Sequence, residues 1–132
     1  MTQEEEKNLL LKDLCTRLPY GVRYRHFTWN DEYGETYIAA QIYSINTDGY
    51  VKNCHDDETV YIDKVRPYLF PLSSMTEEQK KEYQYITERW MNDPVYSISD
   101  SIDWLNKNHF DYRGLIEKGL ALEAPKEMYK TE

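Results

Sequence analysis

Four short segments with alternating apolar side chains, separated by clusters of turn residues, fill residues 22–63 and set the strongest limit on the fold. The second segment, residues 36–45, is the clearest of the four, because Ile38 and Ile42 fall on the same face of an extended strand. The Asp-Gly pair that follows it is typical of a hairpin turn. The pattern predicts a four-stranded antiparallel meander that curls into a small twisted sheet or an SH3-like barrel.

An amphipathic helix is predicted before the meander, over residues 3–18. Thr2 and Glu5 have the spacing of a capping box, in which each side chain binds the other residue's free backbone N–H group. Apolar side chains recur at three- and four-residue spacing and form one stripe, which is expected to face the core. The stripe consists of Leu10, Leu11, Leu14, Cys15 and Leu18.

The C-terminal half is predicted to be helical after a connector. The connector, residues 64–75, contains two prolines but also apolar side chains, so it is expected to pack on the core. Three helices are expected, at residues 77–92, 98–108 and 112–118. Asn108 is the expected left-handed stop of the second helix, and Asp111 is the expected cap of the last. The polar tail from residue 123 onward is expected to fray.

These patterns predict one α+β domain over residues 1–132. A chain of 132 residues suits a single domain and can bury a core without disulfide or metal staples. The expected order is an N-terminal helix, a four-stranded antiparallel twisted sheet or barrel, and two to three C-terminal helices.

The charge of the chain is negative and evenly spread. The formal net charge is −8, and residues 1–72 and 73–132 each carry 12 acidic and 8 basic residues. Such a charge repels phosphate backbones and anionic lipid surfaces. We therefore expect neither a nucleic acid nor a membrane among the partners of this protein.

Three features of the sequence predict a cytoplasmic location. The N-terminal segment is acidic, whereas a secretory leader begins with basic residues. No apolar run approaches the roughly 18 residues of a membrane span. The two cysteines, Cys15 and Cys54, are fewer than the disulfide framework of a small secreted domain usually contains, so they are predicted to be free thiols.

The densest group of polar side chains is the segment Cys54-His55-Asp56-Asp57-Glu58. A structural zinc site needs four ligands, usually as two spaced pairs, whereas Cys54 and His55 are adjacent. Further Cys or His ligands would have to come from distant positions, namely Cys15, His26 and His109. We interpret the segment as a charged hairpin loop and predict no metal ion and no cofactor.

The sequence contains no recognisable catalytic constellation. A cysteine nucleophile would need Cys15 or Cys54 beside His26 or His109, but Cys15 lies on the apolar stripe. The acidic residues that follow Cys54 disfavour its thiolate form. None of the five glycines forms a phosphate-binding loop.

One stretch of the chain, around Arg23 and Arg25, is locally basic and interleaved with aromatic residues. Strand alternation places these arginines and Phe27 on one face, opposite to Tyr24 and His26. Such a face can stack on single-stranded nucleic acid. Because the chain is acidic overall, we favour a solvated face whose arginines pair with nearby acidic side chains.

Tyrosine is unusually frequent, with 13 residues, and many of them fall in the predicted sheet. The first expectation is cross-strand packing. The alternative is an exposed aromatic patch that anchors a protein partner. The residues of this possible partner surface are Tyr24, Tyr33, Tyr37, Tyr43, Tyr50 and Tyr61.

Three segments carry a resemblance to a known group of proteins. They are residues 13–22 (DLCTRLPYGV), residues 65–76 (VRPYLFPLSSMT) and parts of residues 103–125, which include HFDYRGLI and GLALEAP. They resemble segments of short proteins of gut anaerobic bacteria and their prophages or mobile elements, a group without an assigned activity. The resemblance implies a bacterial or phage setting, and it implies no functional residue.

The sequence favours a non-enzymatic protein-binding or adaptor domain, because aromatic residues are abundant and no catalytic group is evident. A first alternative is an acidic mimic or inhibitor of a host nucleic-acid-binding protein, which would need its negative charge gathered on one face. A second alternative is a small enzyme that uses Cys54, His55 and Asp56. A recess that holds a perturbed histidine or cysteine would favour the enzyme.

Overall fold

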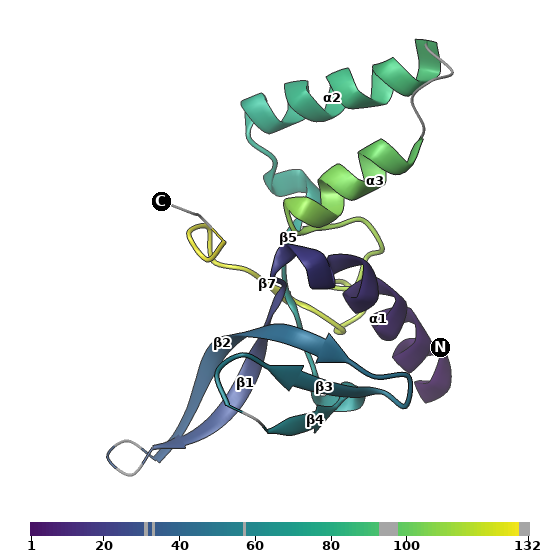
Figure 1. Ribbon diagram of the computed structural model, residues 1–132. Coiled ribbons are helices and arrows are strands. Elements are labelled where there is room, and N and C mark those ends of the chain that lie inside the picture. Colours follow the sequence, from purple (N-terminus) through teal and green to yellow (C-terminus); the bar gives the residue numbers. More distant parts are fainter. Residues whose placement is uncertain (31, 33, 57, 93–97, 130–132) are drawn as a thin grey trace.

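The computed structural model describes residues 1–30, 32, 34–56, 58–92 and 98–129. The predicted α+β class is confirmed: α1 (Gln3–Arg17) precedes an antiparallel sheet, and α2 (Glu77–Asn92) and α3 (Ile98–Lys107) follow it. Figure 1 shows the α2–α3 pair at one end of the molecule, the sheet at the other end, and α1 beside the sheet. Among the described helices, none combines the length and the apolar character needed to cross a membrane.

The antiparallel sheet has the strand order β1-β2-β3-β4. Its strands are β1 (Arg23–Asn30), β2 (Gly34–Ile45), β3 (Tyr50–Asn53) and β4 (Thr59–Tyr61). The register between β2 and β3 shifts between Ile42 and Ser44, and such a bulge increases the local twist of a strand. The sheet therefore curls into an open half-barrel, with β1 and β4 as its two edge strands (Figure 1).

A second, smaller sheet was not predicted. It consists of β5 (Tyr68–Pro71), β6 (Phe110–Asp111) and β7 (Leu122–Glu123), and both outer strands run parallel to the central β5. The predicted connector at residues 64–75 thus contains a central strand, and it packs on the core as expected, since Val65 and Leu69 are fully buried.

Helix α1 begins with the predicted capping box between Thr2 and Glu5. The prediction that Cys15 packs in the core is wrong, because its side chain is exposed. The buried face of the helix is turned relative to the predicted stripe and consists of Leu10, Asp13, Leu14 and Arg17. The buried face of α1 therefore includes an ion pair between Asp13 and Arg17, where the apolar pattern predicted only Leu and Cys side chains.

The chain after α3 differs from the prediction in three ways. The helix expected at residues 112–118 is a series of turns, although the Asp111 carboxylate does accept hydrogen bonds from the backbone N–H groups that follow it, as a cap would. The residue with a left-handed backbone at the end of α3 is His109, with φ at 62°, and not Asn108. The tail does not fray at residue 123, because β7 pairs with β5 and Ala124 is buried.

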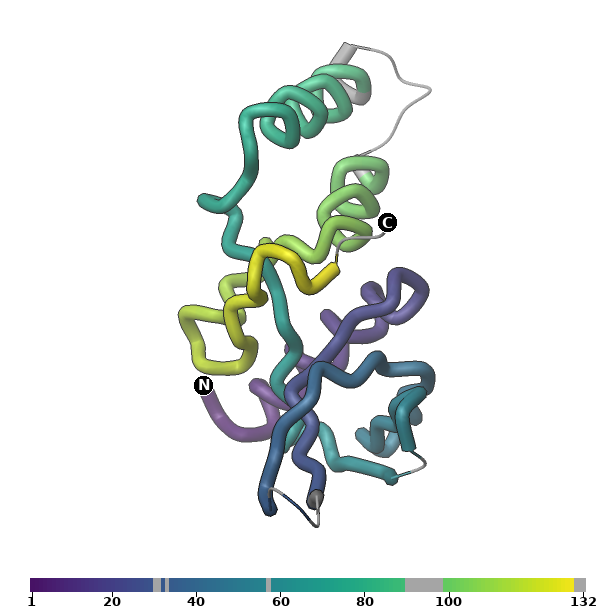
Figure 2. The backbone as a smooth tube through the Cα atoms, turned by 90° about the vertical axis from the view of Figure 1, so that its left-hand side faces the viewer, coloured from purple at the N-terminus to yellow at the C-terminus, as the bar shows by residue number. Residues whose placement is uncertain are grey.

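Two hydrophobic clusters form the interior. The larger one lies between α1 and the half-barrel. The smaller one consists of Trp104 and Leu105 of α3 and Phe110 of β6, with side chains of α2 packed against it. Neighbouring residues of β5 point in opposite directions, so that Leu69 joins the larger cluster and Phe70 packs on the smaller. Strand β5 thereby connects the two ends of the molecule, as Figure 2 also shows.

Candidate functional site

The outer face of the β1–β2 hairpin carries three large exposed aromatic side chains. Phe27, Trp29 and Tyr37 are 44%, 67% and 54% exposed. The predicted alternation along the first strand is confirmed, because Tyr24 and His26 on the opposite face are buried. In Figure 1 the far end of this hairpin projects away from the rest of the sheet.

The register of the hairpin groups these side chains together. Phe27 lies opposite Tyr37 on the neighbouring strand, and their rings meet edge to face at 5.9 Å. The guanidinium of Arg25 lies over the ring of Tyr37, 3.9 Å from its centre. Arg25, predicted to pair with an acidic side chain, thus stacks on an aromatic ring. We call Arg25, Phe27, Trp29 and Tyr37 the outer hairpin face.

The six tyrosines of the predicted partner surface do not share one site. Tyr24 is 1% exposed, so its inclusion was wrong, because even-numbered positions of β1 face the core. Tyr33 lies outside the described residues. Tyr50 is exposed and meets the half-buried Tyr61 edge to face on the neighbouring strand.

Tyr43 is also exposed and shares the outer side of β2 with Tyr37. The two lie six positions apart along the strand, which corresponds to about 20 Å. Tyr37 is therefore the member of the predicted set that belongs to the outer hairpin face.

A cavity of about 460 Å³ adjoins the outer hairpin face along the edge of β1. Its lining includes Phe27 and Tyr37 together with three basic side chains, Arg25, Lys64 and Arg66. This part of the surface is therefore locally basic, in contrast to the net charge of −8 of the whole chain. His26 and Glu58 also line the cavity.

A hydrogen-bonded ring of four side chains links β1 to the end of β3 and to the loop between β3 and β4. Nδ2 of Asn53 donates to Oη of Tyr24 at 3.0 Å and to Oδ1 of Asp56 at 3.2 Å. Oη of Tyr24 lies 3.1 Å from Nδ1 of His26, and Nε2 of His26 lies 3.1 Å from Oδ2 of Asp56. The ring therefore ties one edge strand of the half-barrel to the loop that precedes the other edge strand.

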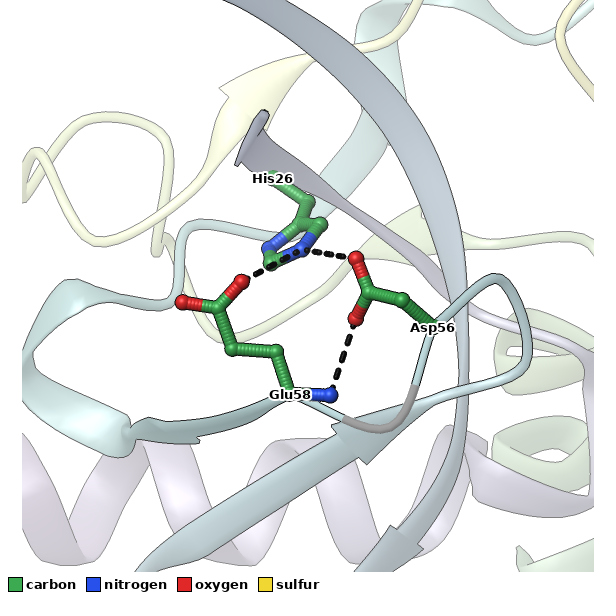
Figure 3. A group of neighbouring side chains, drawn as sticks. All are labelled: His26, Asp56 and Glu58. Carbon is green, nitrogen blue, oxygen red and sulfur yellow. Dashed lines mark hydrogen bonds and ion pairs between the residues drawn. The ribbon is translucent and has the colours of Figure 1, made fainter. Parts of the chain in front are cut away.

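Glu58 completes a cluster with His26 and Asp56, in which one ligand atom of each residue lies within 4.8 Å of the others. Figure 3 shows the imidazole of His26 projecting from β1 toward both carboxylates. His26 is 3% exposed, whereas Asp56 and Glu58 are 38% and 63% exposed. The hydrogen bond from the backbone N–H of Glu58 is the main cause that lowers the pKa of Asp56. The cluster thus combines a buried imidazole with two accessible carboxylates.

The predicted loop cluster is brought together only in part. Cys54 and His55 are exposed and do not belong to the cluster, and Asp57 lies outside the described residues. The prediction considered His26 as a distant ligand, but it did not pair this residue with the acids of the loop. Its inward position on β1 was the available signal, since a buried histidine needs polar partners.

A second cavity, of about 650 Å³, lies between β5, the end of α3 and the C-terminal tail. His109 stacks on Tyr129 there, with ring centres 3.6 Å apart, and no described residue hydrogen-bonds to its buried Nδ1. Burial, aided by the positive charges of Arg17 and Arg23, lowers the pKa of His109 to about 4. Tyr129 was not predicted as part of any site, since it stands in a polar tail that was expected to fray.

Comparison of the chain with known protein families, curated proteins and solved structures gave no match.

Proposed function

We propose that this protein is a binding module that docks another protein on its outer hairpin face. The observation that carries the proposal is the exposure of three large aromatic side chains, Phe27, Trp29 and Tyr37, on one face of a projecting hairpin. Aromatic residues and arginine are the side chains that protein interfaces concentrate at their centres. Arg25 adds a guanidinium that is already ordered against the ring of Tyr37.

The chemistry beside this face favours a partner segment that contains both apolar and acidic side chains. Arg25, Lys64 and Arg66 line the adjoining cavity and offer positive charge to carboxylates. The net charge of −8 opposes the approach of a nucleic acid over most of the surface. We therefore propose a protein partner and not a nucleic acid.

We place this binding module in the cytoplasm. The free, exposed thiols of Cys15 and Cys54 support a reducing compartment. The bacterial or mobile-element setting implied by the resemblance stays a prediction.

The proposal can be tested with the immobilised full-length chain and an extract of the cells that produce it. The wild-type chain is compared with the double variant Phe27→Ser/Trp29→Ser and with Tyr85→Ser. Tyr85 is a matched control because it is 62% exposed and lies on α2, at the opposite end of the molecule. Both variants are first checked for an unchanged circular dichroism spectrum.

We expect a protein that is retained by the wild type and by Tyr85→Ser, lost with the double variant, and insensitive to nuclease treatment of the extract. Its release by moderate salt would agree with the basic cavity beside the face. Equal retention by the double variant, or loss of all binding after nuclease treatment, would contradict the proposal.

A further inference from the structure

We propose that His26, Asp56 and Glu58 form a binding site for one divalent transition-metal ion, represented by Zn²⁺, with solvent completing the coordination shell. The three side chains form the one group of histidine, cysteine and acidic residues with metal-site spacing in the part of the chain that the structure describes. Two of them lie in the loop segment that the sequence had suggested as a polar cluster. The third comes from the inner face of β1.

The distances between the ligand atoms fit one shared ion. Zn²⁺ binds imidazole nitrogen and carboxylate oxygen at about 2.0–2.2 Å. Ligands at neighbouring tetrahedral or octahedral positions are then separated by roughly 3.0–3.6 Å. Nε2 of His26 lies 3.1 Å from Oδ2 of Asp56 and 3.7 Å from Oε2 of Glu58. The carboxylate oxygens of Asp56 and Glu58 lie within 4.8 Å of each other. Glu58, the most exposed of the three residues, is the side chain that would close around the ion.

The two ligands nearest the core are already oriented by other hydrogen bonds. Oδ1 of Asp56 accepts from the backbone N–H of Glu58 at 3.0 Å and from Nδ2 of Asn53, which leaves Oδ2 for the ion. Nδ1 of His26 is paired with Oη of Tyr24, whose second lone pair can accept an N–H bond while Nε2 binds the metal. Metal-bound histidines and carboxylates are commonly fixed in this way by outer partners.

The ligand set also indicates which class of ion would bind. One imidazole nitrogen favours ions such as Zn²⁺ over Mg²⁺ or Ca²⁺, which prefer oxygen ligands alone. The two carboxylates together balance the charge of a divalent ion. Three basic side chains, Arg25, Lys64 and Arg66, line the cavity that His26 and Glu58 also line, and their positive charge opposes a cation there. Two of the three are held by other contacts, since Arg25 stacks on Tyr37 and Nη1 of Arg66 donates to the carbonyl oxygen of Val65.

This inference does not depend on the proposed docking function. The metal ligand His26 lies on the inner side of β1, whereas Phe27 and Trp29 lie on the outer side. A variant of the outer hairpin face is therefore expected to bind the ion normally. Failure of one proposal leaves the other standing.

The test is a calorimetric titration of Zn²⁺ into the full-length protein at neutral pH, with the reduced protein kept free of chelators. We expect one saturable site per chain and a rise in the thermal midpoint with the ion. Glu58→Gln is the main variant, because its exposed side chain can be changed without disturbing the core. The affinity of Glu58→Gln for Zn²⁺ should be at least tenfold lower than that of the wild type, and the affinity of His26→Asn should be lower still.

Three variants serve as controls. His55→Asn and Cys54→Ser remove exposed metal-binding groups next to the site, and Asp103→Asn removes a carboxylate on α3. All three should bind Zn²⁺ as the wild type does, and Co²⁺ bound to the protein should show no thiolate charge-transfer band. Absence of saturable binding, unchanged affinity in Glu58→Gln, or loss of binding in His55→Asn or Cys54→Ser would overturn the proposal.

Discussion

At the scale of single residues, the ion pair between Asp13 and Arg17 is the most unusual feature of the interior. Both side chains are fully buried, and Nε of Arg17 lies 2.8 Å from Oδ2 of Asp13. Nη2 of Arg17 also donates to the carbonyl oxygen of Phe110 at 2.6 Å. The partly buried Arg113 donates to the carboxylate of Asp13 as well. These contacts fix α1 to the segment that follows α3.

Replacing Asp13 with Asn should destabilise the protein strongly. The guanidinium of Arg17 would stay buried without its counter-charge, a situation that typically costs about 3–5 kcal/mol. Urea denaturation followed by tryptophan fluorescence measures the change. Glu77→Gln is the control, because it removes an exposed pair with Lys80 that is worth at most about 1 kcal/mol. A loss below about 1 kcal/mol in Asp13→Asn would contradict this view of the interior.

The lowered pKa of His109 predicts how the stability of the protein depends on pH. Its pKa is lowered from 6.5 to about 4 by burial, so below pH 6.5 the unfolded chain takes up a proton that the folded chain does not. The free energy of unfolding should therefore not depend on this group above pH 6.5. It should fall as the pH decreases toward 4, by up to about 1.4 kcal/mol per pH unit. Unfolding measurements between pH 7 and 5 test this slope.

The matched variant is His109→Asn, since asparagine tolerates the left-handed backbone at this position. It should be less stable at pH 7 but show a shallower slope between pH 7 and 5. An equally steep slope in the variant would assign the titration to other groups.

Predictions from the sequence were least accurate for the burial of single side chains. Helical periodicity predicted that Cys15 would be buried. It did not predict the burial of Asp13 or Arg17, because charged residues are rarely fully buried. Arg17 is paired with Asp13 one helical turn away, but it also needs the carbonyl oxygen of Phe110, which lies 93 residues further along the chain. Helical periodicity cannot reveal that second partner. The inward position of His26 was predictable, because it follows from the two-residue period of a strand.

At the scale of elements, the turn between β2 and β3 depends on Gly49. Its φ is 93°, and a Cβ atom there would lie 3.1 Å from the side chain of Lys7 and 3.3 Å from that of Ile62. Gly49→Ala should therefore combine backbone strain with contacts so tight that Lys7 and Ile62 must shift slightly. We expect a loss of roughly 2 kcal/mol or more in the free energy of unfolding.

Gly119→Ala separates these two causes. Gly119 also has a positive φ, at 75°, but nothing lies within 4 Å of an added Cβ. It should cost about 1 kcal/mol through backbone strain alone. Equal losses in the two variants, measured by urea denaturation, would show that the close packing around Gly49 contributes nothing.

The C-terminal tail is held by Tyr129, whose hydroxyl bridges two strands. Oη accepts from the backbone N–H of Arg23 at 2.8 Å and donates to the carbonyl oxygen of Tyr68 at 2.8 Å. Tyr129→Phe should lower stability by about 1–3 kcal/mol, because it leaves buried backbone groups without a partner. It should also increase hydrogen exchange at the N–H of Arg23. An unchanged exchange rate there would mean that the tail is not anchored by this hydroxyl.

The long elements were predictable and the short ones were not. Helix α1, strand β2 and the capping boxes at Thr2 and Thr76 follow from local patterns, and the capping box at Thr76 forms with Gln79 as expected. Strands β6 and β7 have two residues each, which is too short for any periodicity. They exist because β5 offers them a pairing edge, which is a property of the folded chain.

At the scale of the whole molecule, strand β1 separates two surfaces with different chemistry. On its inner side, Tyr24 bonds to the end of β3 and His26 bonds to the β3–β4 loop, and these contacts hold the open half-barrel together. Its outer side presents Phe27 and Trp29 to solvent. The sequence predicted these two faces, but it could not show that the outer one stays uncovered, because coverage depends on where α1 and the C-terminal segments pack.

The most direct test of the docking proposal is site-specific photo-crosslinking in the cells that produce the protein. A benzophenone amino acid replaces Trp29 in one variant and Tyr85 in the other, two exposed positions at opposite ends of the molecule. We expect position 29 to crosslink to one defined protein, and position 85 not to capture it. Equal capture of that protein from both positions, or crosslinks from position 29 to nucleic acid alone, would contradict the docking proposal.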